Sequence, residues 1–437
     1  MHCCIAMCGL IGPGYHGGAM LAWNVAKSAL RQGHRVTLLS LFDTSSEGNP
    51  YLPWKEEQIR ALHAMGIAVE LVEYRYSDLR PSGIKDSIIR RIVEFVRPTV
   101  QRYFLWRKLQ SQTESQLQRI KPDAIFCFHF DILSALYTTT IAPIIFYAGD
   151  PWHLPAYFRW KMKAPSFRKY FVDLPRYLIF AKAVKQCMFE MMRRCKKNAA
   201  VAAHDAAWFR KKRYGYNTSY FRIPVTDPLG GRWNVELVRV RKSKSKFRIL
   251  FIGGLGGTTT NWALRFLVNE LLPELEKRGI VDQFELHHVG VGKLADEFRS
   301  LASRPYIRMK GYVEDIGAEF LSADIVLEPT PIDLGIRTRI ITAFSYGSCV
   351  ITHQANTRGI PEILHENNAL VANTGKGFAD AILRVLQDER LRERLGANAR
   401  STFEQYFSED KAAAHIVKEI EDVVNVEVGN LKIYRVV

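Results

Sequence analysis

The clearest chemical pattern in this chain lies between Gly335 and Glu362. Gly335 is followed by two arginines, Arg337 and Arg339, at the predicted start of a helix. A helix start offers backbone N–H groups and the positive end of the helix dipole, and guanidinium groups donate paired hydrogen bonds to phosphate oxygens. The sequence therefore predicts a diphosphate site, for a nucleotide or an activated sugar, in the second half of the chain.

A carboxylate on a glycine turn follows the two arginines. Glu362 ends the segment Gly-Ile-Pro-Glu at 359–362, after a strand predicted over 349–353. An acceptor carboxylate beside a close backbone suits the hydroxyl groups of a ribose or a sugar. Two simpler interpretations stay open: Glu362 only caps its turn, and the arginines are solvated surface charges.

Strands and helices alternate on both sides of this pattern. A strand at 3–11, a glycine turn at 12–18, a helix at 19–32 and a strand at 35–40 form a βαβ unit. Further strands are predicted at 68–72, 124–128, 144–147, 199–203 and 219–223. The second half has predicted strands at 247–253, 284–289, 307–310, 325–328, 349–353 and 369–371, and helices at 261–277, 315–322, 338–346, 376–387 and from Ser408 to about 424. This alternation predicts an α/β protein of two doubly wound domains that face each other across a cleft.

The predicted division of the chain follows from its linker composition. We expect a first domain at 1–228, a polar, basic linker at 229–246 and a second domain at 247–407. Residues 408–437 are expected to form a final helix and tail.

Composition places the chain among soluble globular proteins. Of its 437 residues, 47% are hydrophobic and 24% are charged. No run reaches the roughly 18 apolar residues that a membrane span needs, and residues 1–11 lack the basic leader of a signal peptide. The seven cysteines show no Cys-x-x-Cys spacing. We therefore expect a cytoplasmic protein without disulfides and without a metal site.

The positive charge is concentrated in the first half. Residues 1–240 hold 35 Lys and Arg against 18 Asp and Glu, whereas residues 241–437 hold 26 of each. Such asymmetry indicates a polyanionic partner. Two basic, apolar-rich helical segments at 85–109 and 166–197 either pack on their own domain or contact an anionic membrane surface. Nucleic acid is not favoured, because no recognition motif accompanies the charge.

Six motifs in one order carry a family resemblance. They comprise Gly17-Gly18 with the following helix and Gly33-His34-Arg35, the segment 251–255 with Asn261, 311–315, 323–329, 335–347 and 359–362. In this order the sequence resembles the GT-B glycosyltransferases, and is similar to family 4 of the retaining, nucleotide-sugar-dependent enzymes. The resemblance implies two Rossmann-like domains, with 1–228 binding the acceptor and 247–407 binding the nucleotide sugar. It also implies that the helix and tail at 408–437 cross back to the first domain.

The resemblance also implies roles for individual residues. His129 would lie beside the transferred sugar, and Arg337 and Arg339 would neutralise the pyrophosphate. For His129, a structural role as a core-edge histidine stays open. The implied donor-binding residues are Gly17, Gly18, Gly254, Asn261, Val313, Asp333, Thr342 and Glu362.

One departure from the family pattern concerns its pair of glutamates, which are separated by seven residues. Here the second position is Thr342, and the first is Leu334 or, with a one-residue gap, Asp333. A threonine can hydrogen-bond a ribose hydroxyl but supplies no negative charge. The departure leaves donor choice and activity open, and a catalytically silent scaffold that binds a nucleotide sugar or a partner enzyme remains an alternative.

The implied activity is the transfer of a sugar, with retained configuration, to a glycan, lipid-linked or small-molecule acceptor. The arginines would replace a divalent ion, so no cofactor is expected, and a peripheral position at the inner face of a membrane would suit a lipid-linked acceptor. A Rossmann dehydrogenase is a further alternative, because residues 12–17 match Gly-x-Gly-x-x-Gly. Against it, the second strand is predicted to end at Ser40, and the nearest acid, Asp43, lies beyond it.

Overall fold

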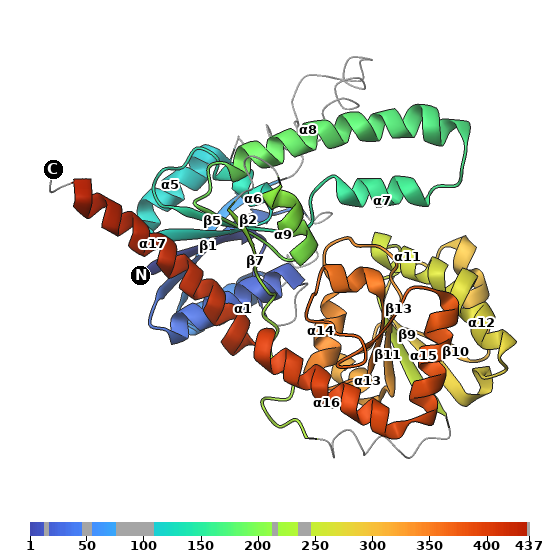
Figure 1. Ribbon diagram of the computed structural model, residues 1–437. Helices are drawn as coiled ribbons and strands as arrows, with labels where there is room; N and C mark the ends of the chain where they lie inside the picture. Colours follow the sequence, from blue (N-terminus) through green and yellow to red (C-terminus); the bar gives the residue numbers. More distant parts are fainter. Residues whose placement is uncertain (13–16, 46–54, 76–108, 212–216, 235–245, 435–437) are drawn as a thin grey trace. The chain divides into compact units, whose positions relative to one another are not determined.

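The computed structural model describes residues 1–12, 17–45, 55–75, 109–211, 217–234 and 246–434. It divides into two compact units (Figure 1). Unit 1 comprises Met1–Pro224 together with Ala412–Val437, and unit 2 comprises Val225–Lys411. Most of the basic segment 85–109, most of the connector 228–246 and the middle of the glycine turn 12–18 lie outside the described residues.

Unit 1 is built on a parallel sheet in the order β3-β2-β1-β4-β5-β6-β7. Its strands are β1 (His2–Cys8), β2 (Arg35–Asp43), β3 (Ile67–Tyr74), β4 (Ala124–Phe128), β5 (Ile144–Ala148), β6 (Lys197–Ala200) and β7 (Thr218–Tyr220). Its α-helices are α1 (Gly17–Arg31), α2 (Lys55–Ala64), α5 (Gln110–Ile120), α6 (Phe130–Ala135), α7 (Leu154–Met162), α8 (Leu174–Met192), α9 (Ala203–Arg210) and α17 (Ala414–Tyr434). The central strands are almost wholly apolar, because helices cover both faces of a parallel sheet.

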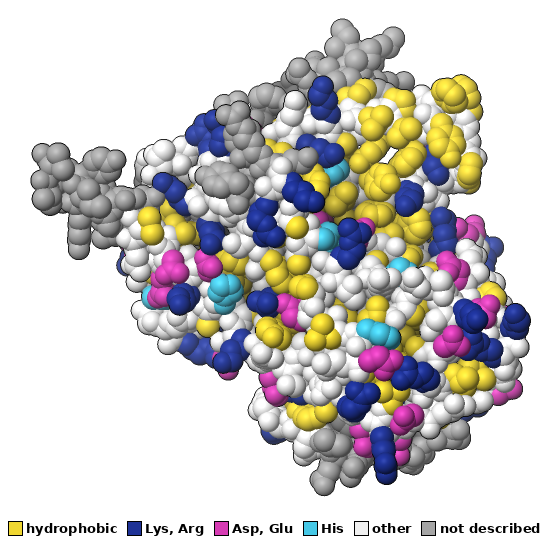
Figure 2. Space-filling view, in the orientation of Figure 1, with side chains coloured by type: hydrophobic (Ala, Val, Ile, Leu, Met, Phe, Trp, Pro, Cys, Tyr) yellow, Lys and Arg dark blue, Asp and Glu magenta, His cyan; other side chains and the backbone are white. Residues whose placement is uncertain are grey.

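Two helices of unit 1 form a long pair. The rings of Trp160 on α7 and Tyr177 on α8 stack with their centroids 6.3 Å apart. Figure 1 shows the two helices extending from the sheet side by side. Figure 2 shows hydrophobic side chains gathered on the surface over this pair.

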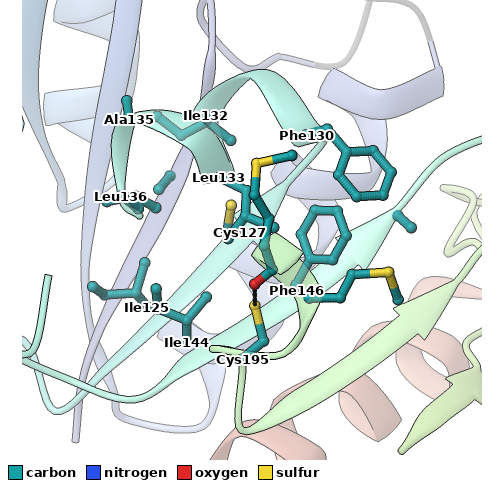
Figure 3. Close-up of a cluster of buried hydrophobic side chains, with 14 of the residues drawn as sticks. Ile125, Cys127, Phe130, Ile132, Leu133, Ala135, Leu136, Ile144, Phe146 and Cys195 are labelled. Atoms are coloured by element: carbon teal, nitrogen blue, oxygen red, sulfur yellow. Dashed lines mark hydrogen bonds between the residues drawn. The ribbon is translucent and has the colours of Figure 1, made fainter. Parts of the chain in front are cut away.

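One buried hydrophobic cluster of unit 1 lies between the sheet and the helices α6 and α8 (Figure 3). Phe130 of α6 packs its ring 4.7 Å from that of Phe146 on β5. Cys127 of β4 and Cys195 lie in the same buried cluster. All seven cysteines are free in the structure, and most are buried as small core residues.

Unit 2 has a second parallel sheet, in the order β10-β9-β8-β11-β12-β13. Its strands are β8 (Phe247–Ile252), β9 (Phe284–Val289), β10 (Ile307–Gly311), β11 (Ile325–Glu328), β12 (Val350–His353) and β13 (Leu370–Ala372). Its α-helices are α11 (Thr258–Phe266), α12 (Leu272–Lys277), α13 (Ile316–Ser322), α14 (Thr338–Ser345), α15 (Gly375–Gln387) and α16 (Glu389–Tyr406). A π-helical turn, η4 (Leu267–Leu271), joins α11 to α12. The expectation of two doubly wound α/β domains is confirmed for each unit by itself.

Several predicted elements differ in their bounds. Strand β2 ends at Asp43 and not at Ser40, because its last residues pair with β3 as far as Asp43↔Tyr74. The basic helix expected at 166–197 consists of the π-helical turn η2 (Lys169–Asp173) and α8. It ends at Met192, because Lys197 begins β6 and pairs with Ile145.

The C-terminal part contains a helix that the sequence pattern did not predict. Helix α16 shows only a narrow apolar stripe, and Gly396 on it packs so closely that a Cβ there would lie 2.4 Å from the carbonyl oxygen of Gly347. After a π-helical turn, η8 (Glu409–Ala413), α17 belongs to unit 1 and runs to Tyr434, beyond the expected end near 424. His34 of the loop after α1 lies 2.7 Å from Glu421 on α17.

Candidate functional site

In each sheet one pair of neighbouring strands marks a change in the direction of winding. Such switch points leave a crevice at the carboxyl ends of the strands, where doubly wound proteins bind ligands. In unit 2 this point lies between β8 and β11, which pair through Ile249↔Ile325. In unit 1 it lies between β1 and β4, which pair through Cys3↔Ala124.

The loop after β8 forms one side of the crevice in unit 2. Gly253 begins it, and the Thr260 hydroxyl of α11 approaches so closely that a Cβ on Gly253 would lie 2.7 Å from it. From the β9 side, a Cβ on Gly290 would lie 2.1 Å from the carbonyl oxygen of Gly253. Gly254 follows with an exposed backbone. Only a glycine-rich loop can keep backbone this close to both neighbours and still leave its edge open to a ligand.

The other side of the crevice holds a buried ion pair. Glu328, the last residue of β11, is fully buried, and the guanidinium of Arg339 on α14 donates to both of its carboxylate oxygens, with Nη2 3.0 Å from Oε1. Thr330 also donates to Oε1, from its backbone nitrogen at 3.2 Å and from its hydroxyl. These contacts use most of the acceptor capacity of the carboxylate.

The ionisation of Glu328 follows from competing effects. Burial by itself would raise the pKa of its carboxyl, but the charges of Arg339 and Arg337 and the hydrogen bonds hold the pKa below its ordinary value. Glu328 is therefore ionised, and its charge balances that of Arg339.

The remaining nitrogen of Arg339 is turned toward the β8 loop. A Cβ on Gly253 would lie 3.4 Å from Nη1, and the guanidinium lies over the ring of Phe251 at 5.8 Å. Within the described part of the chain, no acceptor hydrogen-bonds Nη1. The side chain is 17% exposed. This geometry points a charged hydrogen-bond donor at the loop.

Arg337 is held differently. It is the N-cap residue of α14, is 7% exposed, and its guanidinium donates to the carbonyl oxygens of Leu334 and Ile336, the latter at 3.3 Å. It therefore closes the loop that precedes α14. Neither arginine is a solvated surface charge, and direct contact of either with a phosphate stays a prediction.

A buried histidine supports the β8 loop from β9. The Nε2 of His288 donates to the carbonyl oxygen of Gly253 at 3.0 Å. Burial lowers the pKa of His288, and the charge of Arg339 lowers it further, so the ring is neutral at pH 7. Sequence reasoning missed both His288 and Glu328. An ionisable residue at the end of an otherwise apolar strand is the signal that could have found Glu328.

The other residues predicted for the donor site lie on loops after the strands or on helices that begin there. Val313 follows β10 and is half-buried, and Asn261 lies on the first turns of α11. Asp333 forms an ion pair with Arg358 at 2.7 Å. Glu362 is 8% exposed in its turn. The hydroxyl of Thr342 donates to the carbonyl oxygen of Thr338 at 3.2 Å, so it is already bonded within α14.

In unit 1 the structure places His129 beside Gly18, which was predicted for the site, and beside Gly149, which was not. His129 follows β4 with φ 72° and ψ 154°, a region that non-glycine residues rarely occupy, and its side chain is exposed. A Cβ on Gly18, next to the start of α1 at Gly17, would lie 3.3 Å from Nε2 of the ring. A Cβ on Gly149, just after β5, would lie 2.9 Å from Cε1. The imidazole therefore lies at the β1/β4 switch point, close to the backbones of Gly18 and Gly149. At Gly18 the ring of Phe128, whose Cε1 would lie 2.3 Å from a Cβ, is the group that requires glycine.

Comparison with known proteins adds the family. A family model described as glycosyl transferases group 1 matches residues 246–388. Unit 2 contains a group 1 glycosyltransferase domain. The matched range includes Glu328, Arg339 and the β8 loop. No curated protein matches the chain in sequence.

Solved structures resemble the chain along nearly its whole length. A glycosyltransferase from Rickettsia africae ESF-5 is 14% identical, covers 97% of this chain and 98% of its own, and has a TM-score of 0.62. Sucrose-phosphate synthase from Thermosynechococcus elongatus is 13% identical, with 97% and 99% covered and a TM-score of 0.65. HepE of Anabaena, solved with UDP and glucose, is 14% identical, with 95% and 98% covered and a TM-score of 0.60. The likeness establishes the fold, so the chain with its group 1 domain is a GT-B protein.

Two features are absent from the described residues. Within the ranges given above, no helix combines the length and the hydrophobicity that crossing a bilayer requires. Among the same residues, no three His, Cys, Asp or Glu side chains gather in a way that could hold a metal ion.

Proposed function

We propose that the protein is a glycosyltransferase that moves a sugar from a nucleotide-diphosphate sugar to an acceptor hydroxyl. One observation carries the proposal: in the group 1 domain, buried Glu328 holds the Arg339 fork so that Nη1 faces the open glycine loop after β8. A diphosphate at that loop would meet this cation and the start of α14. HepE of Anabaena, which shares the fold, is solved with UDP-glucose, which supports this class of donor.

In the proposed reaction one bond to the anomeric carbon breaks and one forms. The bond between the anomeric carbon and the diphosphate oxygen breaks, and the nucleotide diphosphate leaves with the electron pair. The acceptor oxygen bonds to the same carbon, and its proton passes to the departing diphosphate. Because negative charge grows on the leaving diphosphate, Arg339 stabilises the transition state more than the bound donor. The family resemblance supports retention of configuration, which the anomeric signals of the product in NMR would test.

The proposed partners follow from the two units. His129, exposed at the switch point of unit 1, would contact the transferred sugar or the acceptor. The positive charge of the first half supports a glycan or lipid-linked acceptor at an anionic membrane surface and a cytoplasmic, peripheral location. We propose no cofactor besides the donor itself, with the arginines in place of a divalent ion.

The first test is the thermal shift of the whole protein with UDP, GDP, ADP and CDP and their sugars. Stabilisation by one nucleotide, abolished in Arg339→Ala, is the expected result. The matched control is Arg384→Ala, which removes a surface arginine paired with Glu366 in the same unit. A flat response to every nucleotide, or an equal response in wild type and Arg339→Ala, would overturn the assignment of Arg339.

A catalytically silent scaffold is the second candidate function, and Thr342 favours it. Its hydroxyl bonds within α14, and it offers no charge where relatives have a glutamate. Nucleotide binding without transfer or donor hydrolysis, over a broad donor panel, would favour the scaffold.

One argument against the dehydrogenase alternative is removed by the structure, and a different argument against it appears. Because β2 reaches Asp43, an acid does stand at the end of the second strand. The carboxylate of Asp43, however, accepts hydrogen bonds from the backbone nitrogen and the hydroxyl of Ser45, at 2.9 and 2.7 Å, as a turn cap does. The group 1 domain also has no place in a dehydrogenase. Fluorescence quenching by NAD is the check.

A further inference from the structure

The turn between α7 and α8 exposes an unusual amount of hydrophobic surface. Twelve large hydrophobic side chains are exposed in the described chain, and six of them lie between Phe167 and Ile179. Phe167 is 75% exposed, Phe171 is 67% exposed, and their rings stack at 4.5 Å. Single exposed hydrophobic residues are common, but a contiguous group marks an interaction surface.

The segment that contains this turn, with α7 and α8, is strongly basic. Residues 151–200 contain twelve Lys and Arg but only two Asp and Glu. Both acids already face cations: Asp173 pairs with Lys163 at 2.6 Å, and Glu190 pairs with Arg193 at 2.6 Å. Exposed cations such as Arg159, Lys161 and Arg168 flank the two phenylalanines. The surface is therefore suited to an anionic partner.

The exposed Phe167 and Phe171 lie on a turn that internal hydrogen bonds hold in place. Lys169 is 7% exposed, and its ammonium donates to the carbonyl oxygens of Lys161 and Lys163. The same ammonium lies 5.3 Å from the ring of Trp160. The indole nitrogen of Trp160 in turn donates to the carbonyl oxygen of Lys169 at 3.1 Å. These contacts tie α7 to the segment before α8, and so the phenylalanines are displayed by a defined structure.

We propose that this turn docks on an anionic lipid bilayer and places Phe167 and Phe171 in the interfacial region. Aromatic rings favour the boundary between headgroups and acyl chains, and neighbouring lysine and arginine side chains reach the lipid phosphates. The charge decides between occupants, because a second copy of this chain would bring the same basic surface and repel it. The inference assigns specific residues to the membrane contact that the proposed function includes. It rests on the proposed function in one respect: the contact would serve transfer to an acceptor held at a membrane.

The test is sedimentation of the full-length protein with liposomes of phosphatidylcholine alone or mixed with phosphatidylglycerol. We expect binding to the mixed liposomes only, weakened at high salt. The double variant F167S/F171S should lose about tenfold or more of the partitioning. The variant K161Q/R168Q should bind the mixed liposomes more weakly and with a smaller salt dependence. The matched control is Leu364→Ser, which removes a 52% exposed leucine from unit 2 and should change nothing.

Three outcomes would overturn the inference. They are no binding to either liposome, binding that F167S/F171S leaves unchanged, and a wild-type dimer that this variant converts to monomers without any lipid binding. Because both phenylalanines are highly exposed, the variant should unfold at the wild-type temperature. Nucleotide thermal shifts measured on the same proteins without lipid separate the two proposals. If wild type shows no shift with any nucleotide, the transferase proposal fails, while the lipid-docking proposal is still judged by the liposome result.

Discussion

Glu328 holds Arg339 by two guanidinium nitrogens and leaves the third facing Gly253. The two residues are eleven positions apart, one at the end of β11 and the other in the first turn of α14. A buried carboxylate thus fixes the orientation of the arginine and balances its charge. Transfer and nucleotide binding should respond differently when this pair is altered, because orientation and charge act on different steps.

The variant Glu328→Gln separates the two effects. Glutamine keeps the shape but leaves the arginine charge uncompensated, so UDP binding should be kept or strengthened a few fold at low salt. The transfer rate with saturating donor should fall, because the guanidinium loses its two-point hold. Loss of the buried ion pair should lower the unfolding free energy by about 3 kcal/mol. Calorimetry, steady-state kinetics and urea unfolding measure the three quantities.

The control for this prediction is Glu366→Gln, which breaks an exposed ion pair with Arg384 in the same unit. It should cost less than about 1 kcal/mol and leave kinetics unchanged. If Glu328→Gln abolished UDP binding, or left both kcat and stability at wild-type values, the positioning role would be refuted.

His129 and Lys121 form a matched pair of residues with positive φ, at 72° and 48°. Changing either residue to glycine removes the conformational cost, so each variant should stabilise unit 1 by about 1 kcal/mol. Only His129→Gly should lose sugar transfer, and both variants should keep the UDP thermal shift of unit 2. Denaturant unfolding and transfer assays distinguish the two; wild-type transfer by His129→Gly would exclude a chemical role for the ring.

Acid should destabilise unit 1 through His153. Burial, assisted by the charge of Lys185, lowers the pKa of His153 to about 4. In the unfolded chain the ring takes up a proton near its ordinary pKa of about 6.5, so the unfolded state binds more protons between the two values. Stability is therefore full above about pH 6.5 and falls as the pH drops toward 4.

The measurement for this prediction is urea unfolding as a function of pH. His153 should account for about 2 kcal/mol of the stability lost by pH 5. His153→Gln should flatten this part of the curve, and part of the remaining slope should come from His2 of unit 1, whose pKa is also lowered. If the unfolding free energy depended equally on pH in wild type and His153→Gln, the role of His153 would be contradicted.

Local sequence determined much of the architecture. The apolar run at Ala124–Phe128 matches β4 residue for residue, and the helix predicted at 338–346 is α14 within one residue. The glycines that precede the first helix of each unit correctly predicted the loops at the two switch points. Each of these features depends on the periodicity of neighbouring side chains or on a local turn, and so it is visible without tertiary contacts.

Tertiary structure alone decided what the charged residues do. The sequence showed Arg339 at a helix start but not its partner, because burial of Glu328 depends on the pairing of β11 with strands distant in the chain. Likewise, β2 extends to Asp43 only because β3 pairs with it. The exposure of Phe167 and Phe171 follows from the hydrogen bonds that tie α7 to the segment before α8. Burial and ion pairing depend on contacts between residues that are distant in the sequence, and local sequence patterns do not show those contacts.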